Sequence, residues 1–342
     1  MKAVVFDRHG GPEVLQYRQV PDPVRGPRDA LVRVRACALN HLDVFIRRGL
    51  PGVNFSFPHI TGADVAGEVA AIGSEVSRVR VGDPVILAPG ISCGLCAECL
   101  AGHDNLCSAY TVLGYRVNGG CAELVAVPEA NVIPKPENLS FPEAAAMPLV
   151  FLTAWHMLIT RAHLAPSETV LVLAGGSGVG SAAIQIAKMI GARVIATVGS
   201  EAKIEKAKSQ GADEVILHSS GEFRREVKRF TAGRGVDVVF EHVGTATWDQ
   251  SVASLAPGGR LITCGATTGY DAKIDLRFLF SRQLSIMGSY MGPKAELFDV
   301  LEMVRRGKLR PVIDSVLPLA ECAAAETRLE HRDIFGKIVL QP

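Results

Sequence analysis

The sequence lacks the features that mark membrane, secreted and nucleic-acid-binding proteins. No apolar run in its 342 residues approaches the length of a membrane-spanning helix. The N-terminal segment has no long apolar stretch and no small-residue cleavage site, so it predicts no secretion signal. The formal net charge is +1 and no block of Lys and Arg exceeds a few residues, which leaves no electrostatic footprint for nucleic acid or an anionic membrane. We therefore expect a cytoplasmic protein with neither kind of partner.

What the sequence contains is typical of a packed globular protein. Hydrophobic residues make up 48% and charged residues 21%, and the length suffices for two domains of ordinary size. Up to about residue 145 the chain has short apolar or alternating runs separated by Gly, Pro and Asp, which predict a β-rich domain. These runs include Ala30–Ala36, Val65–Ile72 and Asp83–Leu87.

The pattern changes from about Phe151. Helix-like stretches at Gly180–Ile190 and Glu201–Gln210 each end at a glycine, and they separate short apolar runs. Strands that alternate with helices indicate a doubly wound α/β fold with a parallel sheet. The six predicted strands are Thr169–Ala174, Arg193–Val198, Glu214–Leu217, Val236–Phe240, Arg260–Cys264 and Leu284–Tyr290.

The last fifty or so residues return to a mixed pattern. A predicted helix at Lys294–Arg306 is followed by the strand-like runs Ser315–Leu319 and Lys337–Leu340. We therefore predict an α/β protein with a discontinuous β-rich domain. Its parts are residues 1–150 and 291–342, and a dinucleotide-binding domain of residues 151–290 is inserted between them.

Four of the eight cysteines lie on one short segment, in the pattern Cys93-x2-Cys96-x2-Cys99-x7-Cys107. Clustered cysteines in a cytosolic protein more often bind metal than form disulfides. Four thiolates suit a closed tetrahedral zinc site that contributes folding energy rather than catalysis. An iron–sulfur cluster and four unliganded thiols are the alternatives.

A glycine-rich turn joins the first predicted strand of the inserted domain to its first helix. Glycines let the backbone approach a pyrophosphate, and a helix N-terminus offers N–H groups and a positive dipole. We expect this turn to bind a dinucleotide through Gly175, Gly176, Ser177, Gly178, Val179 and Gly180.

The cysteine pattern followed by this turn resembles the medium-chain dehydrogenase/reductase superfamily, over nearly the whole chain. The resemblance implies a GroES-like catalytic domain, a Rossmann domain, a nicotinamide cofactor and hydride transfer. The stretch Ser167–Lys188 is similar to the quinone oxidoreductase branch, although Ser177 stands where that branch has glycine. Relatives pair the edge of the Rossmann sheet across a two-fold axis, so we expect a homodimer or homotetramer.

The end of the second strand of the inserted domain bears on which cofactor binds. A site that prefers NAD(H) would place Asp or Glu at this position, and the chain has Val198. Ser200 can donate a hydrogen bond to a 2′-phosphate, and Lys203 offers a positive charge. These residues favour NADP(H), with NAD(H) as the alternative.

The catalytic zinc site of the superfamily's alcohol dehydrogenases has no counterpart at the matching positions. Asn40 stands where the first ligand would be, and Ala63 stands at the second. Val150 or Phe151 occupies the third. The alternative is a metal site rebuilt from Cys37, His41, His59 and Asp64.

The resemblance also implies roles for other residues. Asn40 is our first candidate for a polar group at the reacting carbon, and Asp43 and Asp64 would orient the pocket. His41 and Lys337 match positions that contact the pyrophosphate. The ends of the later strands and the start of one helix would line the cofactor crevice. These residues are Thr153, His242, Gly244, Gly265, Ala266, Ser289, Tyr290 and Met291.

Without a Lewis acid, reduction of a conjugated carbonyl is easier than interconversion of an alcohol and a ketone, because the developing charge is delocalised. Our leading hypothesis is an NADPH-dependent reductase of quinones or α,β-unsaturated carbonyl compounds. An alcohol or aldehyde dehydrogenase is the second hypothesis. A nucleotide-binding redox sensor or crystallin-like protein with little turnover is the third.

Overall fold

The computed structural model describes residues 1–218 and 222–342, which form two compact units. One unit comprises Met1–Leu149 and Pro293–Pro342, and the other comprises Val150–Gly292. The second is thus inserted into the first, and we refer to them as the outer unit and the inserted unit. The sequence predicted boundaries at residues 150 and 290, which lie within two residues of those in the structure.

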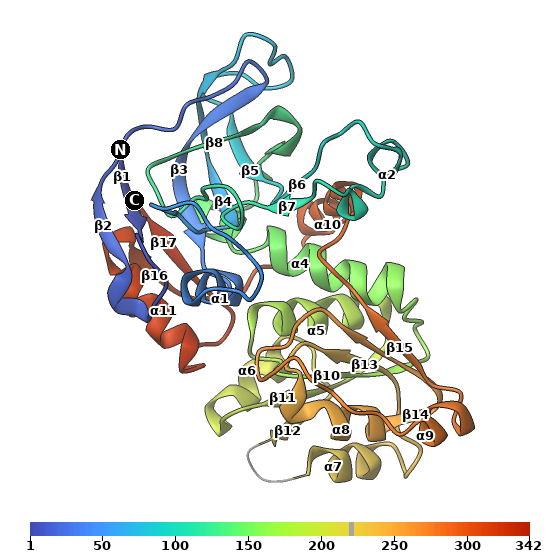
Figure 1. The fold of residues 1–342 in the computed structure, drawn as a ribbon. Coiled ribbons are helices and arrows are strands. Elements are labelled where there is room, and N and C mark those ends of the chain that lie inside the picture. Colours follow the sequence, from blue (N-terminus) through green and yellow to red (C-terminus); the bar gives the residue numbers. More distant parts are fainter. Residues whose placement is uncertain (219–221) are drawn as a thin grey trace. The chain divides into compact units, whose positions relative to one another are not determined.

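A seven-stranded sheet forms the framework of the outer unit (Figure 1). Its strand order is β16-β17-β3-β4-β5-β9, and β8 pairs with β3. The long strands β3 (Asp29–Ala38) and β4 (Asp64–Ile72) are antiparallel, and side chains of β3 alternate between buried and more exposed positions over most of its length. The other strands are β5 (Pro84–Leu87), β8 (Leu124–Pro128), β9 (Val132–Pro134), β16 (Ile313–Pro318) and β17 (Lys337–Gln341).

The C-terminal strands complete this sheet. β17 pairs with β3 through Val339 and Leu340, and it also pairs in parallel with β16. This pairing explains why the outer unit is discontinuous in sequence. Its smaller elements are β1 (Lys2–Val5), η1 (Pro12–Val14), β2 (Gln16–Gln19), β6 (Gly90–Ile91), α2 (Ala97–Leu100), η2 (Asp104–Leu106), β7 (Thr111–Val112), η3 (Glu129–Asn131), α3 (Phe141–Ala145), α10 (Lys294–Arg305) and η7 (Leu319–Glu321).

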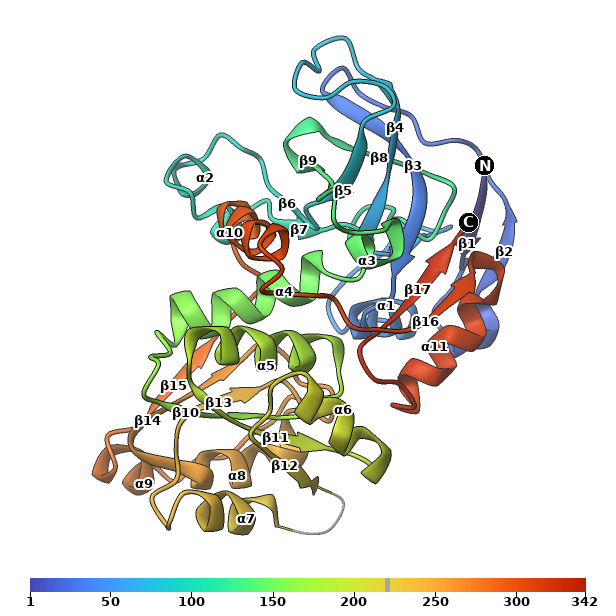
Figure 2. The ribbon, with the colours of Figure 1, turned by 180° about the vertical axis from the view of Figure 1, so that it is seen from behind.

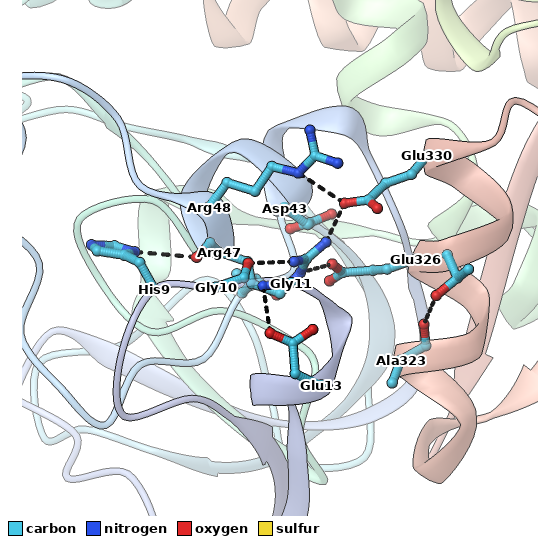
Figure 3. Close-up of polar contacts among 12 residues, drawn as sticks. His9, Gly10, Gly11, Glu13, Asp43, Arg47, Arg48, Ala323, Glu326 and Glu330 are labelled. Atoms are coloured by element: carbon cyan, nitrogen blue, oxygen red, sulfur yellow. Dashed lines mark hydrogen bonds and ion pairs between the residues drawn. The ribbon is translucent and has the colours of Figure 1, made fainter.

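Helices α1 (His41–Arg48) and α11 (Cys322–Glu330) are joined by a buried ion-pair cluster (Figure 3). The Arg47 guanidinium is fully buried, lies 2.6 Å from the Glu326 carboxylate and pairs with Glu330 as well. It also donates to the carbonyl of Gly10 at 2.6 Å. Burial raises the pKa of Glu326 to about 7, although the hydrogen bond and charge of Arg47 oppose that rise.

The inserted unit is a doubly wound sheet of six parallel strands, as predicted. Helices α5 and α6 lie on one face and α7 and α8 on the other (Figure 1 and Figure 2). Its strands are β10 (Thr169–Val172), β11 (Arg193–Val198), β12 (Glu214–Leu217), β13 (Val236–Glu241), β14 (Leu255–Thr263) and β15 (Ser285–Gly288). Its helices are α4 (Pro148–Trp155, which begins in the outer unit), η4 (His156–Arg161), α5 (Gly178–Ile190), η5 (Glu201–Lys203), α6 (Ile204–Ser209), α7 (Phe223–Phe230), α8 (Thr245–Ser254) and α9 (Leu276–Ser281).

The strand order is β12-β11-β10-β13-β14-β15. From β10 the chain adds strands toward one edge of the sheet, and from β13 it adds them toward the other edge. Parallel α/β sheets bind ligands beyond the carboxyl ends of their strands at such a reversal. The segments that follow β10, β11, β13, β14 and β15 are therefore the ones predicted to position a cofactor.

Among the described residues, no helix is long and apolar enough to cross a membrane.

Candidate active site and zinc centre

The four clustered cysteines converge as the sequence predicted. Their Sγ atoms all lie within 4.8 Å of one another, and the Cys96–Cys99 and Cys93–Cys107 pairs are each 3.5 Å apart. Tetrahedral zinc with bonds of about 2.3 Å places its sulfurs about 3.8 Å apart, so the cluster fits one zinc ion. The backbone N–H groups of Leu95 and Cys96 donate to Cys93 and lower its pKa to about 6, which favours the thiolate that a metal needs.

The cysteine-bearing segment is tied to the start of α10. Asp104 accepts the backbone N–H of Lys294 at 2.9 Å and pairs with its ammonium at 2.9 Å. The same ammonium donates to Ser92 and to the carbonyl of Gly90. A metal bound by the cysteines would thereby steady the point at which the chain re-enters the outer unit.

The glycine-rich turn leaves no room for side chains at two positions. A Cβ on Gly180 would lie 2.4 Å from the carbonyl oxygen of Ala174, and one on Gly175 would lie 2.9 Å from Ile184. The hydroxyl of Ser177 caps α5 by accepting the Gly180 N–H at 3.0 Å. This cap gives a physical reason for serine at the position where the resemblance expects glycine. The close packing and the helix N-terminus fit a pyrophosphate.

The end of β11 carries no carboxylate. Val198 is buried, Ser200 is exposed at the start of η5, and Lys203 is the last residue of that short helix. A Cβ on the intervening Gly199 would lie 3.7 Å from the ring of His218. Sequence reasoning missed His218, because it follows β12 and has no pattern of its own.

The turn after β13 is organised by Glu241, which is fully buried. Its carboxylate accepts the backbone N–H groups of His242 and Gly244 at 2.9 and 3.2 Å. It also accepts the hydroxyl of Ser251 at 2.6 Å. Glu241 therefore fixes the shape of the segment that holds two predicted cofactor residues. The sequence analysis did not single out Glu241, although an acidic residue directly after an apolar strand could have marked it.

Other predicted cofactor residues come together in the inserted unit. A Cβ on Gly265 would lie 3.0 Å from the carbonyl of His242, and one on Gly244 would lie 3.0 Å from Ala266. After β15, the side chain of Met291 contacts the hydroxyl of Thr153 at 3.8 Å. The neighbouring Ser289 hydroxyl is buried and has no hydrogen-bond partner among the residues that the structure describes, and Tyr290 is exposed. An unpartnered hydroxyl here fits a polar ligand group.

In the outer unit, the predicted catalytic residues Asn40 and Asp64 form a buried network with Lys337. The Lys337 ammonium lies 2.6 Å from Asn40 Oδ1 and 2.9 Å from Asp64 Oδ2. Asn40 Nδ2 donates to Asp64 Oδ2 at 3.0 Å. Asp64 also accepts the backbone N–H of Leu149 at 2.7 Å. The resemblance assigns Lys337 to the pyrophosphate, which stays a prediction, and in the structure its ammonium bonds to two residues predicted to be catalytic.

Asp43 is buried at the first turn of α1 and is held by backbone donors. Its carboxylate accepts the N–H of Asn40 at 2.7 Å and that of Gly62 at 2.9 Å. Burial, and then the neighbouring Cys121 and Glu326, raise the pKa of Asp43 well above its ordinary value. These bonds fix the position of the Asp43 carboxylate, and its role in orienting the pocket stays a prediction. His41 follows Asn40 as the first residue of α1 and is half-buried.

The alternative metal site from Cys37, His41, His59 and Asp64 is not assembled. His59 Nε2 bonds to the carbonyl of Gly114 at 3.0 Å, Cys37 faces Cys121, and Asp64 pairs with Lys337. Among the residues that the structure describes, the Cys93 cluster is the one group of three or more His, Cys, Asp or Glu residues close enough to hold a metal. Ala63, which stands where the resemblance expects the second zinc ligand, is fully buried.

Comparison with known proteins matches both parts of the chain. The family model for the alcohol dehydrogenase GroES-like domain matches residues 26–137, and the model for zinc-binding dehydrogenases matches residues 178–306. The quinone oxidoreductase of Pseudomonas aeruginosa is 34% identical over 100% of this chain and 99% of its own length. This chain belongs to the medium-chain dehydrogenase/reductase superfamily. The predicted GroES-like and Rossmann folds are thus confirmed.

Two further similarities span different activities within the superfamily. A solved structure described as an NAD-dependent alcohol dehydrogenase is 49% identical, with a TM-score of 0.96 and full coverage of both chains. The crotonyl-CoA reductase of Streptomyces avermitilis is 31% identical over 96% of this chain and 82% of its own length. This protein is therefore a pyridine-nucleotide-dependent oxidoreductase of small molecules.

Proposed function

We propose that this superfamily member is an NADPH-dependent reductase of quinones or α,β-unsaturated carbonyl compounds that works without a catalytic metal. The observation that carries the proposal is the network of Asn40, Asp64 and Lys337. Asn40, which the resemblance puts at a zinc-ligand position of the superfamily's alcohol dehydrogenases, has its side chain committed to hydrogen bonds with the other two residues. Two relatives support the proposal by their names. One is a quinone oxidoreductase, and the other, a crotonyl-CoA reductase, is named for an α,β-unsaturated thioester.

The cofactor supplies a hydride when bound. We propose that the residues from Gly175 to Gly180 hold its pyrophosphate, and for His41 the pyrophosphate contact stays what the resemblance implies. Ser200 and Lys203 would bind a 2′-phosphate, because Val198 offers no carboxylate to repel it. The nicotinamide would contact residues from the ends of the other strands and from α4, namely Thr153, His242, Gly244, Gly265, Ala266, Ser289, Tyr290 and Met291.

A second candidate is an NAD-dependent alcohol dehydrogenase, and the 49% identity to the solved structure described by that name favours it. The two candidates differ in cofactor and substrate. The test is a panel of one enone, one para-quinone and one enoyl thioester with NADPH, against primary and secondary alcohols with NAD⁺ and NADP⁺. Oxidation of NADPH by the conjugated compounds with no alcohol oxidation supports the proposal. Alcohol oxidation alone would overturn it, and tight NADPH binding without turnover would favour a binding protein.

We further propose that the protein forms a homodimer through β15, the edge strand of the inserted unit. An unpaired strand edge is a template for pairing with another copy. Two apolar residues of the preceding helix α9, Leu276 and Phe280, are exposed and would enlarge the contact. Light scattering of Ile286→Lys against the wild type tests this, with conversion to a monomer as the expected result.

A further inference from the structure

The carboxylate of Glu241 is fully buried at the end of β13 and is surrounded by neutral hydrogen-bond donors. Three of these are the backbone N–H groups of the next three residues, and the other two are the hydroxyls of Thr247 and Ser251 in α8. Hydrogen bonds donated to a carboxylate stabilise its ionised form. Among the described residues no Lys or Arg pairs with Glu241, so its charge is held without a counter-charge.

The turns around Glu241 contain no other charged side chain that could offset this charge. The segments that follow β10, β13, β14 and β15 have no Asp, Glu, Lys or Arg. These segments are residues 173–180, 242–248, 264–269 and 289–292. Water screens a buried charge little, so its field reaches neighbouring groups. At Cys264, the first residue after β14, burial and then the charge of Glu241 raise the pKa of the thiol to about 12.

This charge lies directly behind residues that are proposed to contact the nicotinamide. The N–H groups of two of them, His242 and Gly244, donate to the Glu241 carboxylate. The oxidised nicotinamide ring carries a positive charge that the reduced ring lacks. A fixed negative charge near the ring therefore stabilises the oxidised cofactor more than the reduced one. The phosphates are identical in the two forms, so their repulsion by Glu241 cancels in the comparison.

We propose that the charge of Glu241 shifts the bound cofactor toward its oxidised form, a role that rests on the proposed placement of the nicotinamide. When the hydride leaves with its two electrons, the ring becomes a cation, and the fixed carboxylate stabilises that cation. The reduced cofactor is thereby a stronger hydride donor on the protein than in water. Glu241 gains and loses no proton in this role, and it acts on the ring through its field.

The test compares the Kd values of NADP⁺ and NADPH in wild type and in Glu241→Gln, each measured by isothermal titration calorimetry. The substitution keeps the shape of the side chain and removes its charge. We expect the ratio of the Kd for NADP⁺ to the Kd for NADPH to rise about three- to tenfold, as for one poorly screened charge near the ring. A loosened turn would weaken both forms alike, so the ratio separates the charge from its structural role.

Three further variants sharpen the result. Ser251→Ala removes a donor at 2.6 Å but keeps the carboxylate, so the ratio should stay within twofold of wild type. Asp249→Asn removes an exposed negative charge from the same helix and should also leave the ratio unchanged. Thr247→Lys puts an ammonium beside the carboxylate and should raise the ratio as Glu241→Gln does. It keeps the proposal testable if Glu241→Gln fails to fold.

A ratio within twofold of wild type in Glu241→Gln would overturn the role of the charge, even if both Kd values rise together. The same result in Thr247→Lys would overturn it if Glu241→Gln does not fold. If wild type binds NAD(H) and not NADP(H), the ratio is measured with NAD⁺ and NADH instead.

The ratio comes from binding alone, so its outcome is separate from that of the proposed function. A shifted ratio in a protein that reduces no conjugated carbonyl compound would support the role of Glu241 and overturn the proposed function. A wild-type protein that binds neither cofactor pair would overturn both.

Discussion

The ammonium of Lys337 lies 2.9 Å from the carboxylate of Asp64, although the two residues are 273 positions apart in the chain. The pair joins the last strand, β17, to β4 inside the outer unit. Neither side chain is open to solvent, and Asn40 bridges both. The C-terminal strand therefore contributes a charged group to the predicted catalytic centre as well as completing the sheet.

Removing one partner of this pair should be costly. Asp64→Ala leaves a buried ammonium without its counter-charge and the Leu149 N–H without an acceptor. We expect the free energy of unfolding to fall by about 3–5 kcal/mol. Asp7→Ala is the matched control, because it breaks the exposed pair with Arg18 and should cost less than about 1 kcal/mol. Chemical denaturation of both variants measures the difference, and similar losses in the two would contradict the account.

Zinc removal should act locally before it acts globally. Stripping the metal, or replacing Cys107 with serine, loosens the segment that Asp104 ties to Lys294. In hydrogen exchange we expect amides of residues 90–107 and the first turn of α10 to lose protection, while the central strands β3 and β4 keep theirs. Cys264→Ser lies outside the cluster and should retain both zinc and protection. Uniform loss of protection across the outer unit would refute a local role.

Cofactor choice should depend on the charge after β11. Lys203→Ala removes a cation that an NADPH 2′-phosphate would contact, so the Kd for NADPH should rise about tenfold, the equivalent of about 1.4 kcal/mol. The Kd for NADH should change little. Lys208→Ala, an exposed lysine on the adjoining helix that pairs with Glu205, is the matched control. Equal effects of Lys203→Ala on both cofactors would remove the basis for NADP(H) preference.

The stability of the protein should vary with pH through Glu326. Burial raises the pKa of this carboxyl in the folded chain to about 7, from an ordinary value of 4.5. Between these pH values the folded chain keeps a proton that the unfolded chain has lost. The contribution of Glu326 is therefore fully present below about pH 4.5 and is lost as the pH rises through about 7. The loss is about 3 kcal/mol.

Glu326→Gln removes this titration while keeping an acceptor for Arg47. Its free energy of unfolding should gain on the wild type as the pH rises from 5 to 8, as denaturant titrations at each pH would show. Subtracting the two proteins cancels other titrating groups, such as the zinc thiolates. A difference that is constant across this range would show that Glu326 stays ionised beside Arg47 throughout.

Much of the inserted unit could be predicted from the sequence. The spacing of apolar residues and the glycines that end the elements are local signals. β11 and β12 have the predicted bounds, and α5 begins two residues earlier than predicted, at Gly178, directly after its serine cap. β14 begins earlier than predicted, at Leu255, because the Pro257–Gly258–Gly259 stretch that interrupts the apolar pattern stays within the strand. The zinc cluster was equally accessible, since its four ligands lie within fifteen residues.

The polar interior of the outer unit was not accessible in the same way. Arg47 and Glu326 are 279 positions apart, and no periodicity in either segment marks them as partners. The sequence identified Asn40, Asp64 and Lys337 as site residues. That their side chains bond to one another depends on long-range packing, which no local pattern reports. Glu241 looked like the end of an apolar strand, and its hydrogen bonds from five donors form only when the following turn closes around it.

Zinc content per chain tests the central claim most directly. The purified protein would be dialysed without added metal and analysed for zinc and protein together. The account predicts one zinc per chain, held by Cys93, Cys96, Cys99 and Cys107, with loss of that zinc in Cys107→Ser. Two zinc ions per chain, with one retained in Cys107→Ser, would contradict a metal-free reaction centre at Asn40, Asp64 and Lys337.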